Sequence, residues 1–143
     1  MVLLSIMIAA LLFVMTTMIH AGGMTLAVRT VRKEEEHWGL KQGKKHVFIV
    51  CEAVLMMFLV SLLEVLAYTV AYLGLNALPS FEVAFYFSMV TFTTLGYGDI
   101  LLDENWRLLA SFQAANGIIM FGWTTAVVIY VVQRVYFGKE STR

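Results

Sequence analysis

Three long apolar stretches limit what this chain can fold into more than any other feature of its sequence. They cover residues 2–28, 47–75 and 108–132. Each is longer than the roughly 20 residues that a helix needs to cross the hydrocarbon of a bilayer. Of the 143 residues, 60% are hydrophobic and 14% are charged, which is unusually apolar for a water-soluble domain. We therefore predict an all-α membrane protein with three transmembrane helices.

A fourth apolar segment, residues 81–92, is only about half as long as a spanning helix. It fits a re-entrant or interfacial helix, with Ser80 as its N-cap and Glu82 near its positive pole. The first apolar stretch is followed by small residues at 21–23, as a secretory signal would be. We expect a retained helix instead, because no positive residue precedes the apolar core and apolar character resumes through residue 28.

Positive residues set the expected orientation. They crowd the segment 29–46, expected to be a charged loop, and they follow the third span, whereas residues 76–106 contain no Lys or Arg. Because cytoplasmic loops carry the excess of Lys and Arg, we expect both basic segments inside and the N-terminus outside, in the plasma membrane. The whole chain is balanced, with 10 basic and 10 acidic residues, so no nucleic acid partner is expected. The cations concerned are Arg29, Arg32, Lys33, Lys41, Lys44, Lys45, Arg134, Lys139 and Arg143.

The string Thr-Thr-Leu-Gly-Tyr-Gly-Asp at residues 93–99 directly follows the short helix. A potassium ion gives up its water shell only where oxygens replace it, and rings of backbone carbonyls with a threonine hydroxyl can do so. Carbonyls that share one direction need backbone angles that glycine reaches without steric cost, which Gly96 and Gly98 supply. The negative end of the preceding helix would favour a dehydrated cation. The expected ligands are Thr94, Leu95, Gly96, Tyr97 and Gly98, with the side chains of Leu95 and Tyr97 turned away from the ion.

Here the sequence resembles the potassium channels, specifically the small class built from an outer helix, a pore loop and an inner helix. The resemblance covers about residues 47–140 and implies an outer helix at 47–75, a pore helix at 80–92, a filter at 93–99 and an inner helix at 107–134. It implies K⁺ as the permeant ion, no cofactor, and a homotetramer in the lipid bilayer, since one loop supplies a quarter of each carbonyl ring. Residues 1–28 would be an extra helix outside that tetramer, and 138–143 a short cytoplasmic tail.

The resemblance also implies a network behind the filter that supports it, to which Thr93, Asp99, Tyr86 and Val90 are assigned. In it Asp99 accepts a hydrogen bond from an aromatic donor on the pore helix, for which Tyr86 is the candidate; a plain core aromatic is the alternative. Val90 stands where some members carry a glutamate, and Leu95 where Val or Ile is usual. We expect selectivity to survive these departures and filter stability to change.

The third span contains two glycines, Gly117 and Gly122, each of which costs a helix interior about 1 kcal/mol relative to Ala. A gating hinge and close helix packing both explain them; the resemblance favours the hinge for Gly117 and packing for Gly122. Phe121 and Thr125 are four residues apart and are expected to line the cavity below the filter.

Four further residues are expected within the spans. Asn116 either lies near the cavity or bonds another helix. Glu64 and His20 are ionisable groups at membrane depth. Each has either a functional role or a structural one, in which it is protonated or hydrogen-bonded to a neighbouring helix. Cys51 is expected to be a buried thiol.

Several readings compete with a potassium channel. A weakly selective cation pore is disfavoured by the tyrosine between the two glycines, and an uptake transporter by the presence of one loop instead of four. A non-conducting scaffold subunit stays open. We expect no enzyme, since there is no catalytic triad, metal cluster or phosphate loop, and no voltage sensor, since no span carries regularly spaced arginines.

Overall fold

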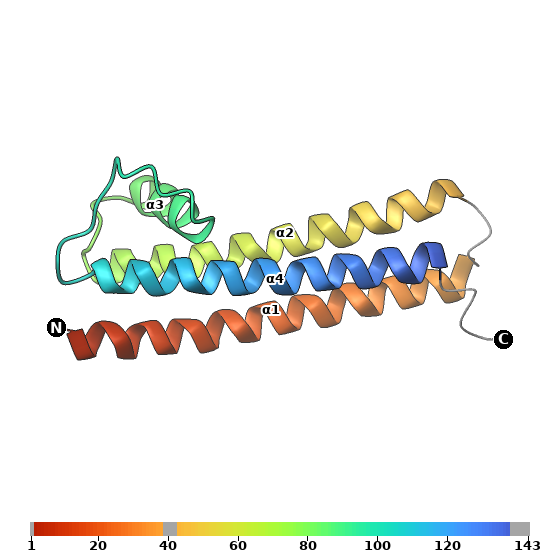
Figure 1. The fold of residues 1–143 in the computed structure, drawn as a ribbon, viewed down its shortest axis with the longest axis horizontal. Helices are drawn as coiled ribbons and strands as arrows, with labels where there is room; N and C mark the ends of the chain where they lie inside the picture. Colours follow the sequence, from red (N-terminus) through yellow and green to blue (C-terminus); the bar gives the residue numbers. More distant parts are fainter. Residues whose placement is uncertain (1, 39–42, 138–143) are drawn as a thin grey trace.

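The structure is a computed structural model that describes residues 2–38 and 43–137. It is built from four helices: α1 (Val2–Trp38), α2 (Gly43–Gly74), α3 (Phe81–Phe92) and α4 (Arg107–Phe137). The helices α1, α2 and α4 lie alongside one another, and the short α3 sits at the end of this bundle where the N-terminus lies (Figure 1). The three long helices are each apolar and long enough to cross a membrane, which confirms the predicted fold class. The protein is therefore an all-α membrane protein.

The segment predicted as a charged loop, 29–46, is helical for most of its length. Helix α1 continues to Trp38 and α2 already begins at Gly43. The loop prediction was wrong because Arg, Lys and Glu are strong helix formers, and no glycine or proline interrupts the chain between Gly23 and Gly39. At 37 residues, α1 is about 55 Å long, so its charged end extends beyond the hydrocarbon.

Helix α1 packs against both α2 and α4, and none of its described residues lies close to the backbone of α3. Two apolar clusters mark the ends of this contact. One, near α3, joins residues of all four helices; the other, at the opposite end, joins residues of α1, α2 and α4. Between them, Gly23 lies so close to Val60 that an added Cβ would overlap its side chain. Small residues allow such close approach in lipid, where helices associate through packing.

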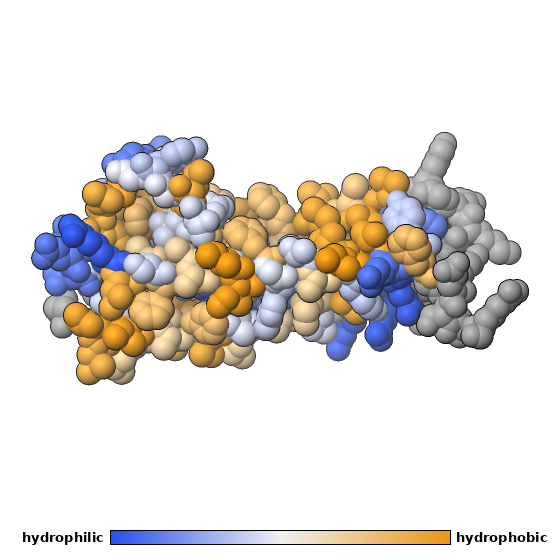
Figure 2. Space-filling model, in the orientation of Figure 1, coloured by the Kyte–Doolittle hydropathy of each residue, from blue (hydrophilic) through white to orange (hydrophobic). Residues whose placement is uncertain are grey.

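The outer surface of the bundle is largely apolar. Figure 2 shows hydrophobic side chains over much of the middle of the molecule and hydrophilic ones gathered towards its two ends. Cys51, expected to be buried, is exposed on this surface. The expectation failed because an apolar run in a membrane helix can face lipid as well as protein, so hydrophobicity alone does not indicate burial.

Some predictions fall on residues outside the description. They concern the side chains of the segment 34–45, which includes the acidic run 34–36 and three of the predicted cytoplasmic lysines, and the tail 138–143.

Candidate functional site

Helix α3 is held between α2 and α4, where its beginning is fixed by a cap. Ser80 has an extended backbone, and its hydroxyl accepts a hydrogen bond from the Val83 N–H at 3.4 Å, so it is the N-cap that the sequence predicts. Glu82 lies in the first turn, where a negative charge interacts favourably with the helix dipole. The C-terminal end of α3 leads directly into the string at 93–99.

A buried hydrogen-bond chain fixes α3 to the two long helices beside it. The Tyr72 hydroxyl on α2 donates to Gln113 Oε1 on α4 at 2.8 Å, and Gln113 Nε2 donates to the Ser88 carbonyl of α3 at 3.2 Å. Both side chains are fully buried. The Tyr72 ring also meets Phe87 edge-on, with centroids 5.3 Å apart. The orientation of α3 is therefore set by polar groups of α2 and α4.

One turn further along, α4 touches the last turn of α3 through a glycine. A Cβ built on Gly117 would overlap the Phe92 carbonyl oxygen and lie 2.9 Å from its carbonyl carbon. A Cβ on Gly122 would meet nothing within 4 Å. Within one chain, close packing therefore explains Gly117 and not Gly122, the reverse of the order expected from the sequence. Helix α4 runs through both glycines without a break.

The backbone of the string alternates in conformation. Thr94, Gly96 and Gly98 have positive φ angles of 60°, 57° and 74°. Leu95 and Tyr97 between them do not. A positive φ at a threonine costs about 1–2 kcal/mol, so Thr94 is a strained residue held by its surroundings. Sequence reasoning missed this strain, because nothing in the residue type of Thr94 signals it.

Hydrogen bonds to α3 fix the direction of the carbonyls in this alternating backbone. The N–H groups of Leu95 and Gly96 both donate to the Val90 carbonyl, at 3.0 and 3.3 Å. In a trans peptide the N–H points opposite to the carbonyl of the preceding residue, and there is no cis peptide among the described residues. The carbonyls of Thr94 and Leu95 therefore both point away from α3. Two successive carbonyls on one side of the backbone are what an ion-binding stack of oxygens requires.

The side chains of the string have separate environments. The Thr93 hydroxyl donates to the Met89 carbonyl at 2.8 Å and so closes the C-terminal end of α3. The side chains of Leu95 and Tyr97 are 55% and 66% exposed in the single chain. Neither residue is therefore covered by the rest of its own chain.

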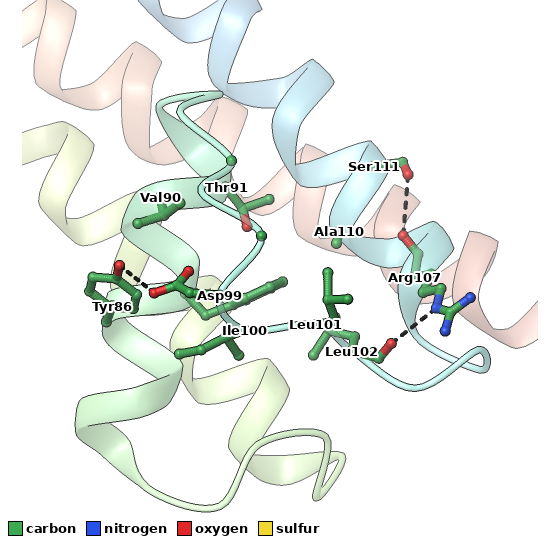
Figure 3. A pocket seen from close by; sticks show the side chains of 13 residues that line it. Tyr86, Val90, Thr91, Asp99, Ile100, Leu101, Leu102, Arg107, Ala110 and Ser111 are labelled. Atoms are coloured by element: carbon green, nitrogen blue, oxygen red, sulfur yellow. Dashed lines mark hydrogen bonds between the residues drawn. The ribbon is translucent and has the colours of Figure 1, made fainter.

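Behind the string, Tyr86 and Asp99 are joined. The Tyr86 hydroxyl donates to Asp99 Oδ2 at 2.7 Å, from α3 to the segment that leaves the string (Figure 3). The hydrogen bond to Asp99 raises the pKa of Tyr86, which keeps the phenol protonated and able to donate. The pair borders a cavity of about 320 Å³ that Val90 and Arg107 also line. Arg107, at the start of α4, turns its guanidinium away from Tyr86 and Asp99, and its Nε donates to the Leu102 carbonyl at 3.1 Å (Figure 3).

The residues expected to line a cavity below the string lie on α4. Phe121, Gly122 and Thr125 are all exposed in the single chain. The Phe121 ring meets Phe92 at the end of α3, with centroids 5.6 Å apart, and the Thr125 hydroxyl donates to the Phe121 carbonyl at 2.9 Å. Of these residues, Phe121 therefore adjoins the C-terminal end of α3.

Asn116 does not lie on this exposed face. It is 1% exposed, and its Nδ2 donates to Thr16 Oγ1 of α1 at 2.8 Å and to the Tyr68 hydroxyl of α2 at 3.1 Å. Of the two roles left open for Asn116, the structure shows the helix-to-helix hydrogen bond. His20 and Glu64 are likewise brought together, with His20 Nδ1 and Glu64 Oε1 2.9 Å apart.

Sequence reasoning missed Gln113 and Tyr72 as supports of α3. The available signal was a polar residue, Gln113, in the middle of an apolar span, which is costly in lipid unless it has a partner. The partner could not have been named, because Ser88 contributes its backbone carbonyl and not its side chain.

Comparison with known proteins gives one match. A family model described as ion channel matches residues 47–134, which include α3, the string at 93–99 and the α2 and α4 segments that hold them. Neither a curated protein nor a solved structure matches the chain. The matched model is a two-helix pore domain of potassium-channel type, and it covers more than half of the chain. This protein therefore belongs to the ion channel family, and its residues 47–134 are the channel domain.

Proposed function

We propose that the protein is a potassium-selective channel in which four copies surround one pore, with residues 93–99 as the filter. The observation that carries this proposal is the backbone of the string: positive φ angles alternate at Thr94, Gly96 and Gly98, while two N–H groups bond Val90 and turn their carbonyls away from α3. K⁺ would bind to the carbonyls of Thr94, Leu95, Gly96 and Tyr97, and to the Thr94 hydroxyl.

The requirement for several copies follows from the same geometry. One chain presents its carbonyls on one side only, so it can surround a dehydrated ion only together with others. The exposed side chains of Leu95 and Tyr97 would be covered by neighbouring copies, and a cyclic arrangement would close the ring. Phe121, Gly122 and Thr125 would then line the cavity below the filter. The negative end of α3 would stabilise an ion there.

The orientation follows from the distribution of charge. Residues 76–106, which connect α2 to α4 through α3, contain no Lys or Arg, while Arg29, Arg32 and Lys33 stand at the opposite end of α1. By the positive-inside rule the filter end and the N-terminus face outward, in the plasma membrane. Asp99, Asp103 and Glu104 would then raise the local cation concentration at the outer mouth.

The test is reconstitution of the purified protein into liposomes with a potassium gradient. We expect potassium flux that exceeds sodium flux by at least about 100-fold, as a filter of carbonyl rings requires. Equal fluxes of the two ions would establish a weakly selective cation channel instead. Absence of potassium flux at every pH and lipid composition would contradict conduction, and mass measurement of the assembled protein tests the tetramer.

A further inference from the structure

Three helices each place one side chain at a single point near the middle of the bundle. His20 comes from α1, Glu64 from α2 and Trp123 from α4. Each lies near the centre of its candidate membrane span, Val2–Lys33, His46–Gly74 and Arg107–Phe137. Helix α1 lies outside the residues that match the channel family, so nothing in that match accounts for this contact.

The two ionisable members of this group are completely buried. His20 Nδ1 and Glu64 Oε1 are 2.9 Å apart, and both side chains have no exposed surface. The ring of Trp123 lies beside the imidazole, with centroids 5.7 Å apart and planes tilted by 52°. Ionisable groups at membrane depth are costly and rare, and they usually serve a function.

The other two polar atoms of the pair are buried without a hydrogen-bond partner in the described part of the chain. They are His20 Nε2 and Glu64 Oε2. When Glu64 is ionised, Nδ1 must carry a hydrogen to donate to Oε1. The proton that the pair can gain or lose is then the one on Nε2, whose N–H bond forms with a proton from water and breaks to return it.

No other strongly charged group competes at this site. In the sequence, the charged residue nearest to His20 on α1 is Arg29, and the one nearest to Glu64 on α2 is Glu52. Helix α4 has no charged residue between its Arg107 and Arg134. Among the described residues, a further titratable group near the pair is the phenol of Tyr68, one turn from Glu64 on α2, whose oxygen accepts a hydrogen bond from Asn116 Nδ2 at 3.1 Å. The charge at this point of the membrane is therefore governed by His20 and Glu64.

We propose that His20 and Glu64 form a proton-binding site within the membrane, and that the bound proton links α1 to the pore-lining helix through Trp123. An imidazolium is attracted to the face of an indole ring, whereas a neutral imidazole lacks this attraction. The two protonation states thus interact differently with α4, immediately beside Gly122. A difference of this kind is what couples one site to another.

Uncharged groups reinforce the link one turn from His20 on α1 and from Glu64 on α2, and two turns from Trp123 on α4. Asn116 on α4 bonds Thr16 on α1 and Tyr68 on α2, so the same three helices meet again. These bonds do not titrate at physiological pH, so they keep α1 in place while the proton on His20 comes and goes. The site is therefore suited to adjust the position of α4 without releasing α1.

The first test measures the proton site without using conduction. In a protein with Trp38→Phe and Trp106→Phe, Trp123 is the one remaining tryptophan. A neighbouring imidazolium quenches indole fluorescence, so emission in lipid nanodiscs should rise by at least about half as pH increases from 5 to 9. The rise should disappear with His20→Asn and persist with His46→Asn, the matched control. A flat titration of the parent protein, or an unchanged one in His20→Asn, would overturn the site.

A second variant tests the role of the carboxylate. Glu64→Gln keeps a hydrogen-bond partner for His20 but removes its counter-charge, and should move the fluorescence transition by about one pH unit or more toward acid. An unmoved transition would show that Glu64 is not part of the site. Helix content by circular dichroism verifies folding, and His20→Gln replaces His20→Asn if the latter does not fold.

The link to the pore rests on the proposed channel function and has its own readout. Potassium flux of the wild-type protein should change by roughly 2- to 30-fold across the fluorescence transition, which is the effect of one cation–π contact on an equilibrium. His20→Asn should remove this pH dependence. If flux is absent from every protein while fluorescence titrates, the channel proposal fails and the proton site stands. If flux varies with pH equally in wild type and His20→Asn, the link to α4 is wrong.

Discussion

The filter and the meeting point of α1, α2 and α4 treat their polar groups in opposite ways. At the meeting point, Asn116, His20 and Glu64 are buried and find partners within the same chain. At the filter, the carbonyls of Thr94 and Leu95 point away from their own helix, and Leu95 and Tyr97 are left exposed. One chain thus packs its own helical bundle, whereas in the proposed channel it supplies only part of the pore.

The comparison distinguishes the bundle, whose polar side chains bond within one chain, from the filter, whose proposed function requires other copies. Polar groups in hydrocarbon need partners, and in the bundle Asn116, His20 and Glu64 each find at least one within the chain. In the proposed channel, the partners of the filter carbonyls are ions held jointly with further chains. Substitutions in the bundle should therefore affect folding of each chain, while those in the filter should affect conduction first.

The largest effect is expected from Gly96→Ala. Its φ of +57° costs an L-residue about 1–2 kcal/mol, and the cost recurs in every copy around one ring of carbonyls. Selective potassium flux in liposomes should fall by at least about 100-fold, while the helix content of each chain is retained. Gly22→Ala, at a helical site with no atom within 4 Å of the added Cβ, is the control and should conduct normally. Undiminished selective flux in Gly96→Ala would show that conduction does not depend on the backbone of the filter.

The next largest effect concerns the glycines of α4. Gly117→Ala should lower the free energy of unfolding by about 3 kcal/mol, because the added Cβ overlaps the Phe92 carbonyl, which belongs to backbone and cannot easily move. Gly122→Ala, with open space around it, should leave stability unchanged or raise it by up to about 1 kcal/mol. Denaturant unfolding in detergent measures both. Equal stability of the two variants would argue for a hinge at Gly117 in place of close packing.

Gln113→Ala should lower the free energy of unfolding by about 2 kcal/mol. It removes a bond to the Ser88 carbonyl and leaves the buried Tyr72 hydroxyl without its partner, and an unsatisfied buried group costs about 1–3 kcal/mol. Gln133→Ala, at an exposed position of the same helix, should change stability by less than about 0.5 kcal/mol. If the two alanine variants unfold at the same denaturant concentration, the buried chain of hydrogen bonds does not hold α3.

The smallest effect is expected from Tyr86→Phe. Loss of its hydrogen bond to Asp99, worth about 1 kcal/mol, should change the open probability of single channels severalfold and leave potassium-to-sodium selectivity intact. Because the bond raises the pKa of Tyr86, the phenol stays protonated, and the difference from wild type should be constant between pH 7 and 9. Tyr136→Phe, exposed on α4, is the control. Unaltered gating in Tyr86→Phe would show that the pair does not support the filter.

Much of the fold could be predicted because the lipid bilayer restricts which sequences can form a spanning helix. A spanning helix must be long and apolar, so 47–75 and 108–132 predict α2 and α4 closely. The helix at Phe81–Phe92 and its Ser80 cap were also predictable from length and local chemistry. The position where α1 ends was not predictable, because a charged segment outside the membrane is compatible with either a loop or a helix.

Apolarity alone determined three membrane helices and a re-entrant one, and the string at 93–99 placed the candidate filter, because both depend on residue types in local order. The tertiary structure decided what sequence order does not encode. It packed Gly117 against the Phe92 backbone and hydrogen-bonded Asn116 to residues of α1 and α2. It also paired His20 with Glu64, which lie 44 positions apart in the chain. The physical reason is that an apolar side chain can contact lipid or protein equally well. A polar group in the membrane needs a specific hydrogen-bond partner, and the packing of the helices determines which residue that partner is.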